Sequence, residues 1–151
     1  MTTTGENLSL RNRALSLLGR REHTRAELQR KLATHAEDPQ ELIALLDDLT
    51  RRGWLSDARF AEALLQSKQA KFGIIRLAHT LRERGVADTV IREQLIALKD
   101  SELERARQVW QSKFGAIPED AKARAKQMRF LQSRGFSLDV IRKVVRGVGD
   151  D

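Results

Sequence analysis

Two six-residue segments of this sequence share one pattern: LRERGV at residues 81–86 and LQSRGF at residues 131–136. Both read Leu-x-x-Arg-Gly-hydrophobic, and both end a run of helix-forming residues, where glycine commonly terminates a helix. Residue 131 follows residue 81 by 50 positions. A motif that returns at this distance predicts a repeated structural unit of about fifty residues.

Apolar positions outside the motif repeat in the same register. In each of four columns the second residue lies 49 positions after the first, and the third lies 50 positions after the second. The columns are Leu32, Leu81 and Leu131; Leu42, Ile91 and Ile141; Leu46, Leu95 and Val145; and Leu49, Leu98 and Val148. Glycines and helix-capping residues between the columns divide each repeat into three short helices.

The sequence therefore predicts an all-α fold, an elongated array of three tandem three-helix units with about nine helices. Helices of about 10–15 residues are marginal in water. We therefore expect neighbouring units to share apolar faces, without one large core, in an array that can curve and bind a partner on its concave side. The expected organisation is a flexible N-terminus at 1–8, units at 9–55, 56–100 and 101–148, and a tail at 149–151.

Local signals support the helix boundaries. Thr24 to Glu27 and Ser101 to Glu104 both have the Ser/Thr-x-x-Glu spacing of a capping box, in which each side chain bonds the other residue's amide. The glycines are expected where helices stop. The first unit departs from the repeat, since residues 32–36 read LATHA and have Ala36 where the other units have glycine. The geometry of its turn is left open.

The sequence contains no recognisable catalytic motif. The chain has no cysteine, and its three histidines stand at no metal-ligand spacing. Nucleophile-elbow, Walker A and GxGxxG patterns are absent. We expect a binding protein that is not an enzyme and has no cofactor or metal. The polar start of the chain and the lack of a long apolar run predict a cytoplasmic protein that does not enter membranes.

The positive charge is graded along the chain. Net charge is +7, and residues 101–151 contribute +4 of it through 11 basic and 7 acidic side chains. Cations before the helix-terminating glycines are explained by the negative end of the helix dipole. That explanation does not cover the run from Lys122 to Arg129, whose basic residues are predicted to line one broad flank of a helix. This run favours contact with phosphates or with an acidic partner.

The chain resembles the RecX family, which regulates the RecA recombinase. The resemblance extends from about residue 8 to residue 148, and it depends on an ordered set of short matches rather than on one motif. The matching residues are Ala14, Leu15, Leu18, Arg21–Thr24, Glu27, Leu28, Lys31, Leu32, Leu49, Gly53, Asp57–Ala61, Lys71–Gly73, Ile75, Phe130, Leu131, Arg134–Ser137 and Ile141.

The resemblance implies a modular protein that lies in the groove of a RecA–DNA filament. There it would block filament growth or promote disassembly, and so lower ATP hydrolysis and strand exchange by RecA. The expected partners are the RecA filament and, weakly or indirectly, single- and double-stranded DNA, bound by a monomer. The candidate contact residues are the exposed cations Arg21, Arg25, Lys71, Lys122, Arg124, Lys126 and Arg129. Two alternatives remain: a general helical nucleic-acid-binding module, and a protein scaffold that does not bind DNA.

Overall fold

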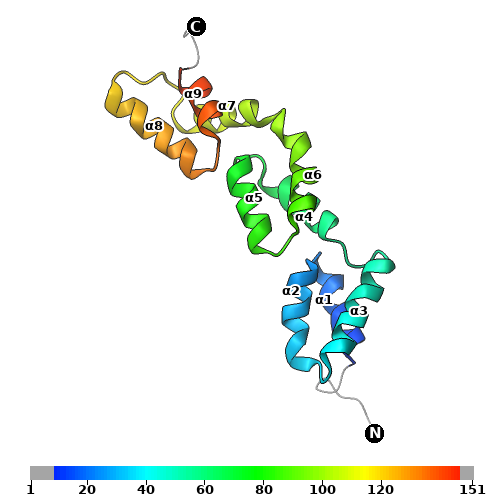
Figure 1. The fold of residues 1–151 in the computed structure, drawn as a ribbon. Coiled ribbons are helices and arrows are strands. Elements are labelled where there is room, and N and C mark those ends of the chain that lie inside the picture. The colour runs from blue at the N-terminus through cyan, green and yellow to red at the C-terminus, as the bar shows by residue number, and fades with distance from the viewer. Residues whose placement is uncertain (1–8, 147–151) are drawn as a thin grey trace.

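The computed structural model describes residues 9–146, which form nine α-helices and one short 3-10 helix. The first set is α1 (Leu10–Arg20), α2 (Arg25–Leu32), the 3-10 helix η2 (Ala33–His35) and α3 (Pro39–Arg51). The second is α4 (Asp57–Lys68), α5 (Ile74–Glu83) and α6 (Asp88–Lys99), and the third is α7 (Glu102–Lys113), α8 (Ala121–Ser133) and α9 (Leu138–Arg146). Figure 1 shows the three sets following one another in an elongated array, which confirms the predicted fold class.

Each set of helices has its own hydrophobic core. The buried clusters centre on Leu28 and Leu46 in the first unit, on Leu77 and Leu81 in the second, and on Leu131 in the third. No cluster of the described residues draws buried members from two units. The absence of one large core was therefore predicted correctly, whereas the prediction that neighbouring units share apolar faces was wrong. Val148, the last member of one column, lies outside the described residues, as do segments 1–8 and 149–151.

The two predicted capping boxes have different outcomes. Thr24 caps α2 as predicted: its hydroxyl accepts from the Glu27 amide at 3.0 Å, and the Glu27 carboxylate accepts from the Thr24 amide at 3.1 Å. The predicted capping box of Ser101 and Glu104 was wrong. Ser101 already has helical dihedral angles and its hydroxyl donates to the Leu98 carbonyl. In this position its side chain does not cap α7.

The units are joined end to end through their second helices, α2, α5 and α8. The C-terminal end of α5 meets the N-terminal end of α2, and the C-terminal end of α8 meets the N-terminal end of α5 (Figure 1). The last carbonyls of a helix and its first amides have no partner within that helix. Because the C-terminus of one helix meets the N-terminus of the next, free carbonyls face free amides, and opposite ends of the helix dipoles lie together. We call the two contacts joint 1 (α2–α5) and joint 2 (α5–α8).

Joint 2 is made largely of backbone. The Gly73 amide donates to the Arg134 carbonyl at 2.8 Å, and the Ile75 amide donates to the Gly135 carbonyl at 3.0 Å. Gly135 has a φ of +89°, and a Cβ atom there would overlap the Cβ of Arg76. A Cβ atom on Gly73 would overlap the Gly135 carbonyl. Both glycines therefore allow two backbones to touch, which a larger residue would prevent.

Joint 1 uses side chains for the same purpose. The Thr24 hydroxyl donates to the Arg84 carbonyl at 2.6 Å, and Gly85, with a φ of +87°, packs against Ala26. The Arg84 guanidinium in turn donates a hydrogen bond to the Glu27 carboxylate at 2.9 Å. Burial acts to raise the pKa of Glu27, but hydrogen bonds from the Thr24 amide and from the arginines outweigh it, so that this pKa lies below its ordinary value.

A carboxylate from the next unit completes each joint. The Asp57 carboxylate, at the start of α4, accepts from the Arg25 amide at 2.9 Å. The Glu102 carboxylate, at the start of α7, accepts from the Ile74 amide at 2.9 Å. In both joints, then, the first residue of a unit's first helix accepts a hydrogen bond from a free amide at the start of the second helix of the unit before it. The start of α7 thus caps α5 through Glu102, whereas the sequence had predicted that Ser101 and Glu104 would cap α7 itself.

The Arg-Gly motif, which the first unit lacks, has the same role in both joints. The motif ends the second helix of a unit and packs on the unit before it. In the first unit α2 ends in η2, and Ala36 adopts an ordinary extended conformation (φ −96°, ψ 121°). Two glycine predictions need correction, since Gly19 lies inside α1 and Gly73 begins α5.

Substituting Gly135 tests joint 2. Gly135→Ala imposes a strained positive φ, which costs about 1–3 kcal/mol, and adds an overlap with Arg76. We expect calorimetry to show a lower melting temperature and a third unit that unfolds separately. Gly53→Ala introduces the same kind of strain in open space, and Gly19→Ala introduces neither effect in a helix. If Gly135→Ala and Gly53→Ala lowered the melting temperature equally, the loss at Gly135 would come from backbone strain alone and not from the joint.

Glu27→Gln tests the charge in joint 1, because glutamine can still complete a capping box. Losing charge-assisted bonds to Arg21 and Arg84 should destabilise the protein by about 1–2 kcal/mol at neutral pH. Because folding lowers the pKa of Glu27, the stabilisation is complete above its ordinary pKa of 4.5 and is lost as the pH falls through the lower folded value. The stability gap between the two proteins, measured by urea unfolding, should close with acid. A gap that is independent of pH would contradict this.

Candidate partner-binding surface

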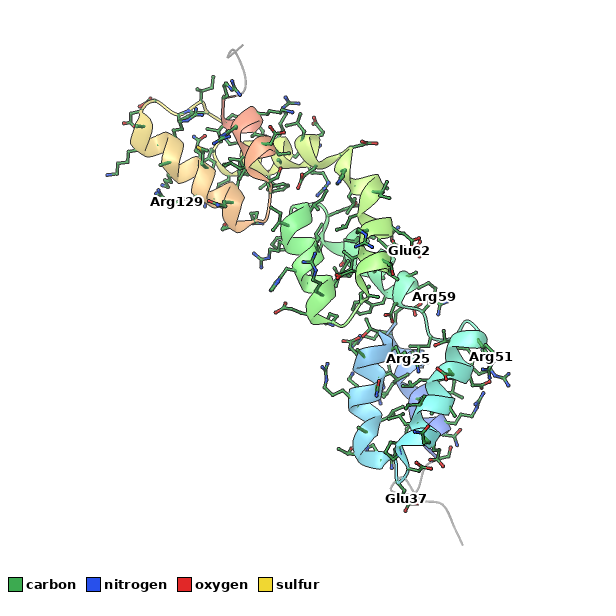
Figure 2. The ribbon with its side chains drawn as sticks, in the orientation of Figure 1. Arg25, Glu37, Arg51, Arg59, Glu62 and Arg129 are labelled. Atoms are coloured by element: carbon green, nitrogen blue, oxygen red, sulfur yellow. The ribbon has the colours of Figure 1, made fainter. Side chains whose placement is uncertain are left out.

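Three of the predicted cations share one face of α8. Lys122, Lys126 and Arg129 are spaced four and three residues apart, which places them along one side of a helix. All three are exposed, and none makes an ion pair among the described residues. Figure 2 shows Arg129 on α8, toward the opposite end of the array from Arg51 on α3. The exposed face of α8 is therefore a row of cations available to an anionic partner.

Arg124 lies on a different side of α8. Two residues correspond to about 200° around a helix, so Arg124 points away from Lys122. It is half-buried, on the side where Gln127 and Leu131 are buried. The run from Lys122 to Arg129 is therefore divided between two sides of the helix.

Lys71 lies beside a groove of about 430 Å³ at joint 2. The groove is lined by Ala70, Lys71, Gln108, Val109, Ser112, Lys113, Phe130 and Arg134, with no acidic side chain among them. Phe130 belongs to α8 and follows Lys126 by four residues, so the wall of the groove continues toward the cations of α8. The fold thus brings Lys71 near the charged face of α8, although the two are far apart in sequence.

Two cations in this groove were not among the sequence-predicted candidates. The Lys113 ammonium lies 5.4 Å from the centre of the Phe130 ring, and the Arg134 guanidinium lies 4.9 Å from the same centre. Arg134 also donates to the Lys71 carbonyl at 3.3 Å. The sequence explained Arg134 as a helix-end cation, and nothing in the spacing of Lys113 indicated a groove, because the groove walls come from α7, from α8 with the residue that follows it, and from the loop between α4 and α5.

Arg21 and Arg25 belong to the surroundings of joint 1. The Arg21 guanidinium bonds the buried Glu27 carboxylate at 3.3 Å, and the Arg25 guanidinium bonds Asp47 at 2.7 Å. Figure 2 shows Arg25 at the boundary between the first two units, near Arg59, whose Nε bonds Glu22 at 2.8 Å. The two residues are thus held in ion pairs within the array, apart from the cations of α8.

Buried polar groups also serve the fold. His23 is buried, with Nδ1 3.0 Å from the Arg21 carbonyl and Nε2 3.1 Å from the Lys31 ammonium. Burial is the main cause that lowers its pKa. Arg105 is buried below the end of α4, where it donates to the Gln69 and Phe72 carbonyls at 2.8 Å. Burial likewise lowers the pKa of Arg105.

Residues 9–146 hold neither a metal-binding cluster nor a membrane-spanning helix. No group of three or more His, Cys, Asp or Glu side chains in this part of the chain could hold a metal ion. None of its helices is long and apolar enough to cross a membrane.

Comparison with known proteins gives three family matches in chain order. Residues 11–49 match the first three-helix domain of RecX, residues 56–95 the second, and residues 100–145 the third. The chain is 48% identical over 146 residues to the regulatory protein RecX of Leptothrix cholodnii, covering 97% of this chain and 93% of that protein. It is 50% identical to the regulatory protein RecX of Chromobacterium violaceum, covering 97% and 95%.

Solved structures agree on the fold. The crystal structure of RecX from Lactobacillus salivarius superposes with a TM-score of 0.82 at 20% sequence identity, covering 91% of this chain and 92% of that one. With all three domains matched in order and with relatives of about half-identical sequence, the chain belongs to the RecX family of regulatory proteins.

Proposed function

We propose that this protein regulates RecA by binding, without catalysis, in the groove of the RecA–DNA filament. Bound there, it would block filament extension or promote disassembly, and so lower ATP hydrolysis and strand exchange by RecA. The observation that carries the proposal is the unpaired row Lys122, Lys126 and Arg129 on an array whose units are bonded end to end. A pre-organised array loses little conformational entropy when it lies along an extended partner.

The surface is suited to a partner that combines protein and DNA. Acidic side chains are mixed with basic ones over most of the chain, which limits affinity for bare DNA, while the third unit has the largest excess of positive charge. We propose that α8 and the adjoining groove with Lys71 meet the most anionic part of the filament. Arg124, half-buried, and Arg21 and Arg25, held in ion pairs, would contribute less.

The charge of α8 also favours a second candidate, a helical nucleic-acid-binding module with no dedicated protein partner. Its affinity would come from counterion release and would fall steeply with salt. We further propose that the protein acts as a monomer in the cytoplasm.

The ATPase activity of RecA on single-stranded DNA tests the proposal. The protein should lower this activity at or below one molecule per RecA, and at a given salt concentration it should bind RecA filaments more tightly than naked DNA. Failure to inhibit over a wide concentration range would overturn the proposal. Equal affinity for filaments and naked DNA would favour the general module instead.

Neutralising the α8 row tests the assigned surface. Replacing Lys122, Lys126 and Arg129 together by Gln should leave the melting temperature nearly unchanged, because unpaired surface residues contribute within about 0.5 kcal/mol each. Inhibition of RecA should weaken at least severalfold. A matched variant replaces the exposed cations Arg92, Lys99 and Arg142 by Gln and loses the same charge. Equal weakening in both variants would show that net charge, rather than the α8 face, governs binding.

A further inference from the structure

An exposed tryptophan stands among arginines at the boundary between the first two units. Trp54 follows the end of α3 and is 45% exposed. The guanidinium carbon of Arg52 lies 5.3 Å from the centre of its ring, and that of Arg11 lies 5.7 Å from it. Figure 2 shows the neighbouring Arg51 at this end of α3. None of these residues belongs to the α8 row or to the groove of joint 2.

Packing does not account for the exposure of Trp54. Three helices end in the same hydrogen-bonded turn, in which the residue after the glycine donates its amide to a carbonyl five positions earlier. In α5 and α8 that residue is Val86 or Phe136, and both are buried. In α3 it is Trp54, and the buried position passes to the next residue, Leu55. The turn holds the backbone of Trp54 firmly while the indole stays at the surface.

One carboxylate organises the surrounding arginines. Asp48 accepts from Arg52 Nε at 2.8 Å, from Arg51 at 2.9 Å and from Arg11 at 3.0 Å. The bond from Arg52, followed by that from Arg11, lowers the pKa of Asp48 to about 2. At neutral pH its charge thus cancels one of the three positive charges. Each guanidinium has five N–H donors and gives Asp48 one of these bonds, so donors remain on all three for a ligand.

We propose that Trp54, with Arg11, Arg51 and Arg52, is a binding site for single-stranded nucleic acid, in which an unpaired base stacks on the indole and the arginines contact the adjacent phosphates. Proteins that bind single strands without reading their sequence combine an exposed aromatic ring with a basic surface in this way. A duplex keeps its bases paired and stacked, so it would meet the cations but not the ring. The site does not depend on the RecA proposal.

The Trp54 site differs chemically from the exposed apolar patch on unit 2. The exposed side chains Ile75 and Ile96 lie along a groove beside α6, where they offer an aliphatic surface. At the Trp54 site the apolar surface is aromatic and is contacted by two guanidiniums. Aromatic rings and guanidinium planes stack on nucleobases, which makes an unpaired base the occupant that this chemistry fits best.

Binding of a deoxythymidine oligonucleotide to the full chain, without RecA, tests the site. Because the second tryptophan, Trp110, is buried in the third unit, quenching of tryptophan fluorescence on binding should come from Trp54 and should disappear in Trp54→Phe. Fluorescence anisotropy of a labelled oligonucleotide should show that Trp54→Ala weakens binding about tenfold and that Trp54→Phe retains most of it. Ile43→Ala, an exposed apolar position on α3, should leave binding unchanged.

Two more measurements make the test decisive if Trp54→Ala folds poorly. Arg51→Gln keeps the indole in place and should reduce the slope of log affinity against log salt by about 0.7. Duplex DNA of equal length should produce little quenching. Unchanged oligonucleotide affinity in Trp54→Ala, or equal quenching by duplex DNA or by polyglutamate, would overturn the proposal.

Discussion

The array depends on one contact, the end-to-end bonding of a second helix to the second helix of the preceding unit. A three-helix unit of this size buries a small core and leaves free amides at the start of its middle helix. In both joints those amides are satisfied from the following unit, by a helix-end carbonyl or by a carboxylate such as Asp57 or Glu102. Three separate cores are thereby linked into one elongated body without a shared apolar interface.

Joining the units through hydrogen bonds leaves their exposed faces free to carry charge. Because hydrogen bonds and close glycine contacts join the units, few large apolar side chains are needed between them. Exposed faces such as that of α8 can then carry charge without disturbing the packing. The joints hold such faces at fixed separations, so the array would lose little conformational entropy on contact with a partner.

Much of the fold could be predicted from the sequence. Helix type, the number of units and the absence of one large core follow from composition, apolar spacing and capping residues, which are local signals. The joints could not be predicted, because they pair residues such as Thr24 and Arg84 that are distant in the chain. The Leu-x-x-Arg-Gly motif is visible in the sequence as a repeat, but only the fold shows that it forms the joint.

The site residues divide in the same way. Helical spacing brings Lys122, Lys126 and Arg129 together, whereas the neighbours of Lys71 and the arginines around Trp54 come from different helices. Whether the joints hold the three units rigidly can be measured as the distance distribution between two spin labels, since the chain has no cysteine of its own to compete for labelling. With labels at the exposed positions Gln29 on α2 and Ala121 on α8, rigid joints predict one narrow distance peak. A broad distribution would contradict the account, since it would mean that the three units move independently.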